Sequence, residues 1–174
     1  MRPTLIYCYD AYCGWCYGFS EVMKKVNSAY KNKLEIEVLS GGMILPEEPV
    51  HIGATAGYIS KAYKRVEELT GAKFGEDYLW HINHPDQSDW YPNSEKPAIA
   101  LCIFKEYFPD QQVSFAADMQ YDYIMKEETL RMTKPTATLL KNMIYRQKNF
   151  MKNSMTKSTK KKHTMNLPCA GNCM

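Results

Sequence analysis

The sequence has no hydrophobic run long enough to cross a membrane. A transmembrane helix needs about 20 consecutive apolar residues, and no run of even about 18 occurs. The N-terminus also lacks the basic region, apolar stretch and cleavage site of a secretory signal, because Met-Arg-Pro-Thr leads directly into an apolar segment. These absences predict a cytoplasmic protein with no membrane partner, whose thiols are mostly reduced at rest.

Acidic residues are scarce in the last part of the chain. Residues 1–125 hold 11 Lys/Arg and 17 Asp/Glu, a net charge of −6, whereas residues 126–174 hold 11 Lys/Arg and 2 Asp/Glu, a net charge of +9. A basic tail on an acidic body can indicate contact with nucleic acid or a membrane. The lysine run at residues 160–162 has no aromatic residues interleaved with it. We therefore expect a solvated segment and no nucleic-acid partner.

Two of the six cysteines have the spacing of a redox pair. Cys13 and Cys16 enclose Gly-Trp, between a strand-like run at residues 5–9 and a helix-like run at residues 20–30. A Cys-x-x-Cys pair at such a turn is typical of thiol–disulfide exchange, in which one thiolate attacks and the second thiol resolves the mixed disulfide. A position at a helix N-terminus would lower the pKa of the first thiol.

The other cysteines are predicted to have no redox role. Cys8 and Cys102 lie in apolar segments, where buried thiols are expected. Structural zinc would need a second ligand pair beside Cys13 and Cys16, and only Cys169 and Cys173 lie close enough together to supply it. A metal-binding module therefore remains an alternative, although we expect neither a metal nor another cofactor.

Hydrophobic periodicity predicts an α/β fold. Residues 5–9 form an apolar and aromatic run typical of a buried strand, and residues 20–30 repeat apolar side chains at helical spacing, with Ser20 as N-cap. Residues 34–39 alternate with period two, which indicates a half-buried strand. This βαβ order predicts two parallel strands with a right-handed crossover.

A helical block is predicted after these strands. Residues 52–70 place apolar side chains on one helical face, and Gly71 is suited to end that helix. Ser94 is a predicted N-cap for a second helix, and a third begins within residues 113–120. Residues 74–93, rich in aromatic side chains, are predicted to be a loop.

Three motifs carry a family resemblance. They are Tyr-Asp-Ala-Tyr-Cys-Gly-Trp-Cys-Tyr-Gly-Phe at residues 9–19, Leu-Ser-Gly-Gly-Met at residues 39–43 and Asn-Ser-Glu-Lys-Pro-Ala at residues 93–98. On these residues the chain resembles the DsbA family of thioredoxin-like proteins, and within it the cytoplasmic FrnE-like subgroup, over roughly residues 3–120.

The resemblance implies both a fold and an activity. The fold is a thioredoxin-like domain with a helical insertion, and the activity is that of a thiol–disulfide oxidoreductase or protein disulfide isomerase. Its substrates would be thiols and disulfides of proteins or small molecules. Cys13 carries over as the nucleophile and Cys16 as the resolving thiol.

The chain divides into three predicted parts. Residues 1–50 form the N-terminal βαβ half of the thioredoxin-like domain, residues 51–125 the helical insertion, and residues 126–174 a basic, poorly ordered tail. The resemblance implies that a cis-proline strand, a second antiparallel strand and a helix should follow the insertion. The tail shows no strand pattern, so the C-terminal strands of the sheet are predicted to be missing.

The composition of the tail suggests a cause for this loss. It is rich in Lys, Thr, Asn and Met, as expected of A-rich codons read out of phase. Codons for residues 124–174 can be chosen so that a shifted frame stays open and encodes a helical pattern. We therefore predict a frameshift near residues 121–124, which the coding DNA across residues 118–130 tests. The predicted consequences are low stability, an aggregation-prone sheet edge and weak turnover. A non-functional product is a further alternative, beside a metal-binding or nucleic-acid-binding protein.

Overall fold

Two parallel strands form the N-terminal part of the structure. In the computed structural model, which describes residues 2–125, strand β1 spans Thr4–Tyr9 and strand β2 spans Glu35–Ser40. They pair in parallel, with Thr4 opposite Glu35 and Tyr9 opposite Ser40. The predictions made for residues 126–174, including the basic tail and the frameshift, lie outside the described residues.

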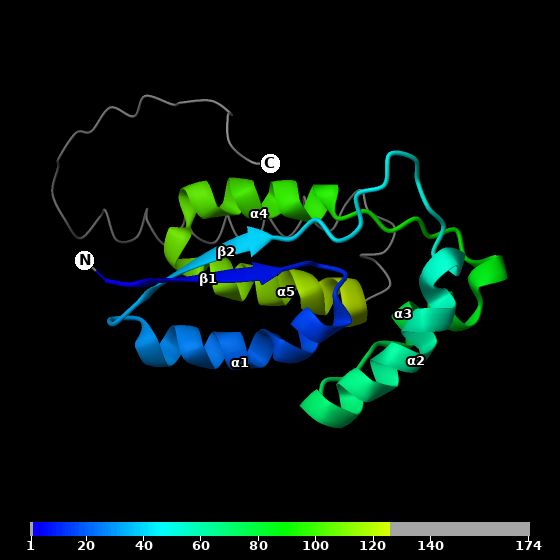
Figure 1. The fold of residues 1–174 in the computed structure, drawn as a ribbon, viewed down its shortest axis with the longest axis horizontal. Coiled ribbons are helices and arrows are strands. Elements are labelled where there is room, and N and C mark those ends of the chain that lie inside the picture. The colour runs from blue at the N-terminus through cyan, green and yellow to red at the C-terminus, as the bar shows by residue number, and fades with distance from the viewer. Residues whose placement is uncertain (1, 126–174) are drawn as a thin grey trace, which may run out of the picture. The chain divides into compact units, whose positions relative to one another are not determined.

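Five α-helices accompany the strands within this part of the chain. In the view of Figure 1, α4 lies above and α1 below the strand pair, with α5 behind it and α2 and α3 together at one end. Every peptide bond in residues 2–125 is trans, and the sheet formed there has the order β1-β2. No helix of this part is both long and apolar enough to span a membrane. The helices are α1 (Gly14–Tyr30), α2 (Gly53–Thr70), α3 (Glu76–Asn83), α4 (Glu95–Tyr107) and α5 (Gln112–Met125), with short 3₁₀ turns at Pro85–Gln87 and Pro109–Gln111.

Helix α1 connects the two strands, so the predicted βαβ unit is confirmed. The predicted start at residue 20 is wrong, because α1 begins at Gly14 with Cys13 as its N-cap. The backbone N–H of Cys16 donates to Cys13 Sγ at 3.4 Å. A sulfur thus takes the place of the hydroxyl or carboxylate that marks a helix start in sequence. Ser20 is buried inside the helix instead.

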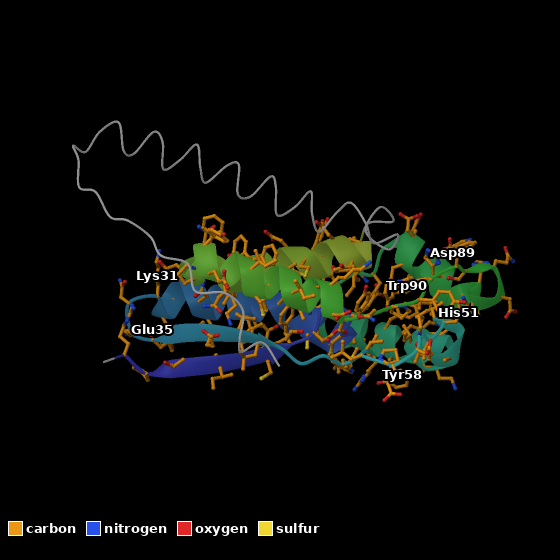
Figure 2. The ribbon with its side chains drawn as sticks, turned by 90° about the horizontal axis from the view of Figure 1, so that it is seen from above. Lys31, Glu35, His51, Tyr58, Asp89 and Trp90 are labelled. Carbon is orange, nitrogen blue, oxygen red and sulfur yellow. The ribbon has the colours of Figure 1, made fainter. Side chains whose placement is uncertain are left out.

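Strand β1 buries only one of its faces. Tyr7 and Tyr9 are buried, whereas Ile6 is 63% exposed and Cys8 is exposed. Figure 2 shows α1, α4 and α5 on one side of the two strands, which explains the alternation. The expectation of a strand without an exposed face is therefore wrong, as is the expectation that Cys8 is a buried thiol.

Helices α2 and α3 give one confirmed and one wrong prediction. Helix α2 ends at Gly71, which adopts φ 73° and donates its N–H to Glu67 O, as a C-terminal glycine does. The segment predicted as loop contains the eight-residue helix α3. Two turns are too few for apolar periodicity to stand out. Only Tyr78 and Ile82, spaced i and i+4, carry it.

Helices α4 and α5 supply most of the core behind the strands. The rings of Phe104 in α4 and Phe115 in α5 stack with centroids 4.0 Å apart, and neither ring is exposed. Gln112, at the start of α5, donates through its amide to Pro109 O and accepts from the backbone N–H of Val38 in β2. This bond fixes α5 against the strand pair, which carries the Cys13 turn at its carboxyl end.

Candidate active site

The turn between β1 and α1 holds the two predicted catalytic residues together. Cys13 is the N-cap of α1, and Cys16 lies in the first turn of the same helix. Besides the sulfur contact, the backbone N–H of Cys13 donates to Asp10 O at 3.1 Å, and Tyr17 N donates to Cys13 O at 2.9 Å. Both thiols are half-buried. The spacing of the pair therefore places one sulfur at a helix N-terminus with the other close to it.

The surroundings of the pair lower the pKa of the Cys13 thiol to about 6. The main cause is a hydrogen bond from the Cys16 thiol to the Cys13 thiolate, and the backbone N–H groups of Cys16 and Trp15 add to it. Burial and the charge of Asp10 act in the opposite direction but are outweighed. The same hydrogen bond and burial raise the pKa of Cys16. At neutral pH Cys13 is the thiolate and Cys16 stays protonated.

Asp10 organises the base of this site, a role the sequence did not reveal. It is 3% exposed. Its Oδ1 accepts from Tyr12 N at 2.9 Å and from the Ser94 hydroxyl at 3.0 Å, and its Oδ2 accepts from Met43 N at 2.8 Å. The Ser94 hydroxyl in turn accepts from Ile44 N at 3.1 Å. One carboxylate thus joins the Cys13 turn, the loop after β2 and the start of α4.

The predicted N-cap position of Ser94 is confirmed, but its side chain does not cap the helix. Ser94 occupies the N-cap position of α4, but its hydroxyl makes no hydrogen bond to that helix. It is fully buried and bonded to Asp10 instead. The signal available in the sequence was the Asn-Ser-Glu-Lys-Pro-Ala motif, which could not show that its serine contacts a residue 84 positions away.

Buried tyrosines surround the thiols. Burial raises the pKa of Tyr7, and the nearby Cys16 and Cys13 raise it further. Burial, with a smaller effect of Cys13, also raises the pKa of Tyr78. Among the described residues the Tyr7 hydroxyl is buried without a hydrogen-bond partner. These phenols stay neutral across the working pH range, so the thiol pair has no second anion among them.

A pocket of about 290 Å³ opens beside Cys13. Cys13, Gly14 and Trp15 line it from the turn, and residues of α2, α3 and the loop after β2 line it elsewhere. The ring of Phe74 lies 3.1 Å from the position that a Cβ on Gly14 would occupy, so the turn and the helical part meet closely here. Cys13 therefore lies beside a partly open pocket.

The other described cysteines are not placed in this site. Cys102 is half-buried on α4, so the expectation of a core thiol is met only partly, and Cys8 lies exposed on β1. Within residues 2–125, no cluster of three or more His, Cys, Asp or Glu is placed to hold a metal. Cys169 and Cys173, the second half of the zinc alternative, lie outside the described residues.

Similarity to known proteins is found among solved structures. Neither a family model nor a curated protein matches the chain. Among solved structures, the cytosolic disulfide reductase DsbM from Pseudomonas aeruginosa matches with TM-score 0.62 and 26% identity, over 81% of this chain and 63% of that one. Its structure with GSH gives TM-score 0.61 and 26% identity, over 81% and 64%.

A second protein shares the fold at lower identity. A candidate protein disulfide isomerase from Nitrosomonas europaea matches with TM-score 0.68 and 19% identity, over 82% of this chain and 65% of that one. The chain thus spans less than two thirds of the length of these proteins. The described part of the chain has a thioredoxin-like fold, similar to that of these disulfide reductase and isomerase structures.

Proposed function

We propose that this protein catalyses thiol–disulfide exchange, with Cys13 as the attacking thiolate and Cys16 as the resolving thiol. The observation that carries the proposal is the position of Cys13 at the N-terminus of α1, where Cys16 donates a hydrogen bond to its sulfur. The similarity to a cytosolic disulfide reductase and to a candidate disulfide isomerase supports it and favours a cytoplasmic location.

The reaction follows from the two unequal thiols. The Cys13 thiolate attacks one sulfur of a substrate disulfide, forming a mixed disulfide and releasing the other substrate sulfur as a thiolate. Cys16 then gives up its proton and attacks Cys13 Sγ, and the second substrate thiolate leaves. The substrate gains two electrons, and the protein is left with a Cys13–Cys16 disulfide. An external thiol returns it to the reduced state, and the reverse sequence oxidises a dithiol.

Trapping the mixed disulfide tests the assignment. The Cys16→Ser variant should attack a protein disulfide such as that of insulin and then remain covalently linked to it, because the resolving thiol is gone. The Cys13→Ser variant should form no such adduct. The matched control is Cys102→Ser, which removes another half-buried thiol and should behave as the parent chain does.

The readout is intact mass under non-reducing conditions after acid quenching. The assignment is overturned if Cys16→Ser forms no adduct, or if Cys13→Ser forms one as readily. Nothing in residues 2–125 favours the metal-binding or nucleic-acid-binding alternatives, since no metal cluster is present there and that part of the chain is acidic.

A further inference from the structure

The pocket beside Cys13 is built almost entirely from apolar and aromatic side chains. Trp15, 45% exposed, lies on one side of it, and the half-buried residues Ile59, Ala62 and Tyr63 of α2 line another. Figure 2 labels two further lining residues, Tyr58 and Trp90, at the end of the molecule that holds α2 and α3. The nucleophile thus lies beside a face of α2 that is only partly covered.

Apart from the Cys13 thiolate, no charged side chain lines this pocket among the described residues. Its other polar side-chain groups are the hydroxyls of a threonine and several tyrosines and the indole N–H groups of Trp15 and Trp90. An anionic group in such a site would lose its hydration with no cation to pair with it. A cationic group would find only the Cys13 thiolate, whose charge is lost when the mixed disulfide forms. An apolar group loses nothing comparable and gains from leaving water. The chemistry of the lining therefore selects an uncharged, apolar occupant.

The size of the pocket limits what can enter. Its volume is about 290 Å³, just below the range of roughly 300–1,000 Å³ that encloses drug-sized ligands. An engineered apolar cavity of about 150 Å³ already binds benzene. The pocket therefore fits one aromatic ring system or one large aliphatic side chain, and it is too small for a folded segment of polypeptide.

We propose that this pocket binds a large apolar or aromatic group attached next to the substrate sulfur that Cys13 attacks. The inference rests on the proposed function and names its substrate class: disulfides flanked by bulky apolar side chains. Cys13 itself lines the pocket, so a group bonded close to the attacked sulfur reaches the cavity when the sulfurs meet. Disulfides flanked only by small or charged groups gain nothing from it.

The first experiment tests the pocket without requiring disulfide turnover. Reduced protein is treated with iodoacetamide or with N-benzyliodoacetamide. In both reactions a thiolate displaces iodide to form a thioether, and peptide mapping gives the rate at each cysteine. At Cys13 the benzyl reagent should react about tenfold faster or more, the gain expected from burying an aromatic ring. At Cys8, exposed on the open face of β1, the ratio of rates should be roughly one.

Two variants of α2 supply the matched comparison. Ala62→Phe fills the pocket from its wall, and the preference of Cys13 for the benzyl reagent should fall to roughly onefold. Ala54→Phe makes the same change at an exposed residue of the same helix outside the pocket and should keep the preference. If Ala62→Phe does not fold, judged by circular dichroism, Thr55→Phe fills the pocket from near the start of α2.

The second experiment measures exchange with a pair of disulfide-bonded peptides that differ in having Phe or Ala beside cysteine. The Phe peptide should exchange about tenfold faster in the parent chain, with no such difference in the filled variant. Equal reagent preference at Cys13 and Cys8 overturns the pocket. Equal exchange of the two peptides overturns the substrate class. If neither peptide exchanges while the benzyl preference persists, the proposed function fails and the pocket stands.

Discussion

At the scale of the residue, the ionisation of a single sulfur separates Cys13 from the other thiols. Its pKa is lowered to about 6, chiefly by the hydrogen bond from Cys16. The thiolate fraction rises with pH through the pKa, so most Cys13 molecules are thiolates at pH 7, whereas an ordinary thiol is only a few per cent ionised there. The rate of iodoacetamide alkylation at Cys13 should therefore reach half its plateau near pH 6.

The reference for this profile is a short peptide with a free cysteine, whose thiol has a pKa of about 8.5. Stopped-flow or mass-spectrometric rates measured between about pH 4 and pH 10, in steps of about one pH unit, give both curves. A Cys13 midpoint as high as that of the peptide would contradict the prediction. It would also remove the electrostatic reason for assigning attack to Cys13.

Asp10 affects this midpoint and the stability of the fold in separable ways. Its negative charge raises the pKa of Cys13, so Asp10→Asn should move the alkylation midpoint below that of the parent. Met43 N–H and the Ser94 hydroxyl both donate to the Asp10 carboxylate, so the asparagine NH₂ group would face one of these donors. The substitution should therefore also lower the free energy of unfolding by about 1–3 kcal/mol. Ser94→Ala removes one of the same hydrogen bonds but keeps the charge.

The Ser94→Ala control should unfold at a lower urea concentration than the parent. Its pH midpoint for alkylation of Cys13 should equal that of the parent. A downward shift in Ser94→Ala as large as that in Asp10→Asn would show that loosening of the turn, and not the charge, sets the pKa.

The sequence predicted the Cys13–Cys16 pair because its signal is local, with two residues between the sulfurs. Asp10 entered that interpretation only as one residue of the motif at residues 9–19. Its partners at Met43 and Ser94 lie 33 and 84 positions away. A hydrogen bond of that span depends on how β1, β2 and α4 meet, and no periodicity within one segment encodes it.

At the scale of the element, the contact between α1 and α2 depends on a glycine. A Cβ on Gly18 would lie 2.8 Å from Thr70 Cγ2 and Oγ1 and 2.9 Å from Val66 Cγ1. Gly18→Ala should therefore push α1 and α2 apart, with a cost of about 1–3 kcal/mol for overpacking that exceeds the helix propensity gained. A lower urea midpoint checks this.

Gly57 in α2 is the matched control, because a Cβ there meets nothing within 4 Å. Gly57→Ala should raise stability by about 0.5–1 kcal/mol through helix propensity alone. Thr70→Ala should restore part of the stability lost in Gly18→Ala. Equal gains from both alanines would show that the helices do not meet at Gly18 as described.

Helices and strands were predicted correctly where the apolar repeat was long enough to recognise, and the predictions were wrong where it was short or interrupted. The parallel strands and α2 follow from alternation and an uninterrupted helical face. The start of α1 was missed because its first turns contain Gly14 and Gly18, which obscure the apolar repeat. Gly18 allows α1 to pack closely against α2, and helix propensity carries no information about such a tertiary contact.

At the scale of the whole molecule, the helices of residues 2–125 cover one face of the strand pair and leave its other face uncovered by that part of the chain. Strand β1 pairs with β2 alone among residues 2–125, and Ile6 and Leu39 are 63% and 40% exposed on these strands. The sequence predicted the fold class and an exposed sheet edge, since the family resemblance implies further strands. It could not show which side chains would line the open face, because that depends on where the helices lie.

This open face should make the protein associate with itself. Exposed apolar side chains beside unpaired backbone groups favour edge-to-edge contact between chains. Ile6→Lys places a charge in the middle of that face and should reduce concentration-dependent light scattering. The matched control is Leu69→Lys, which adds the same charge at a 57% exposed leucine on α2, away from the sheet. An equal reduction in both variants would assign the effect to net charge, and no scattering in the parent would contradict self-association. Only a reduction specific to Ile6→Lys places the associating surface on β1, because both variants replace an aliphatic residue with lysine and carry the same net charge but differ in the element that carries the lysine.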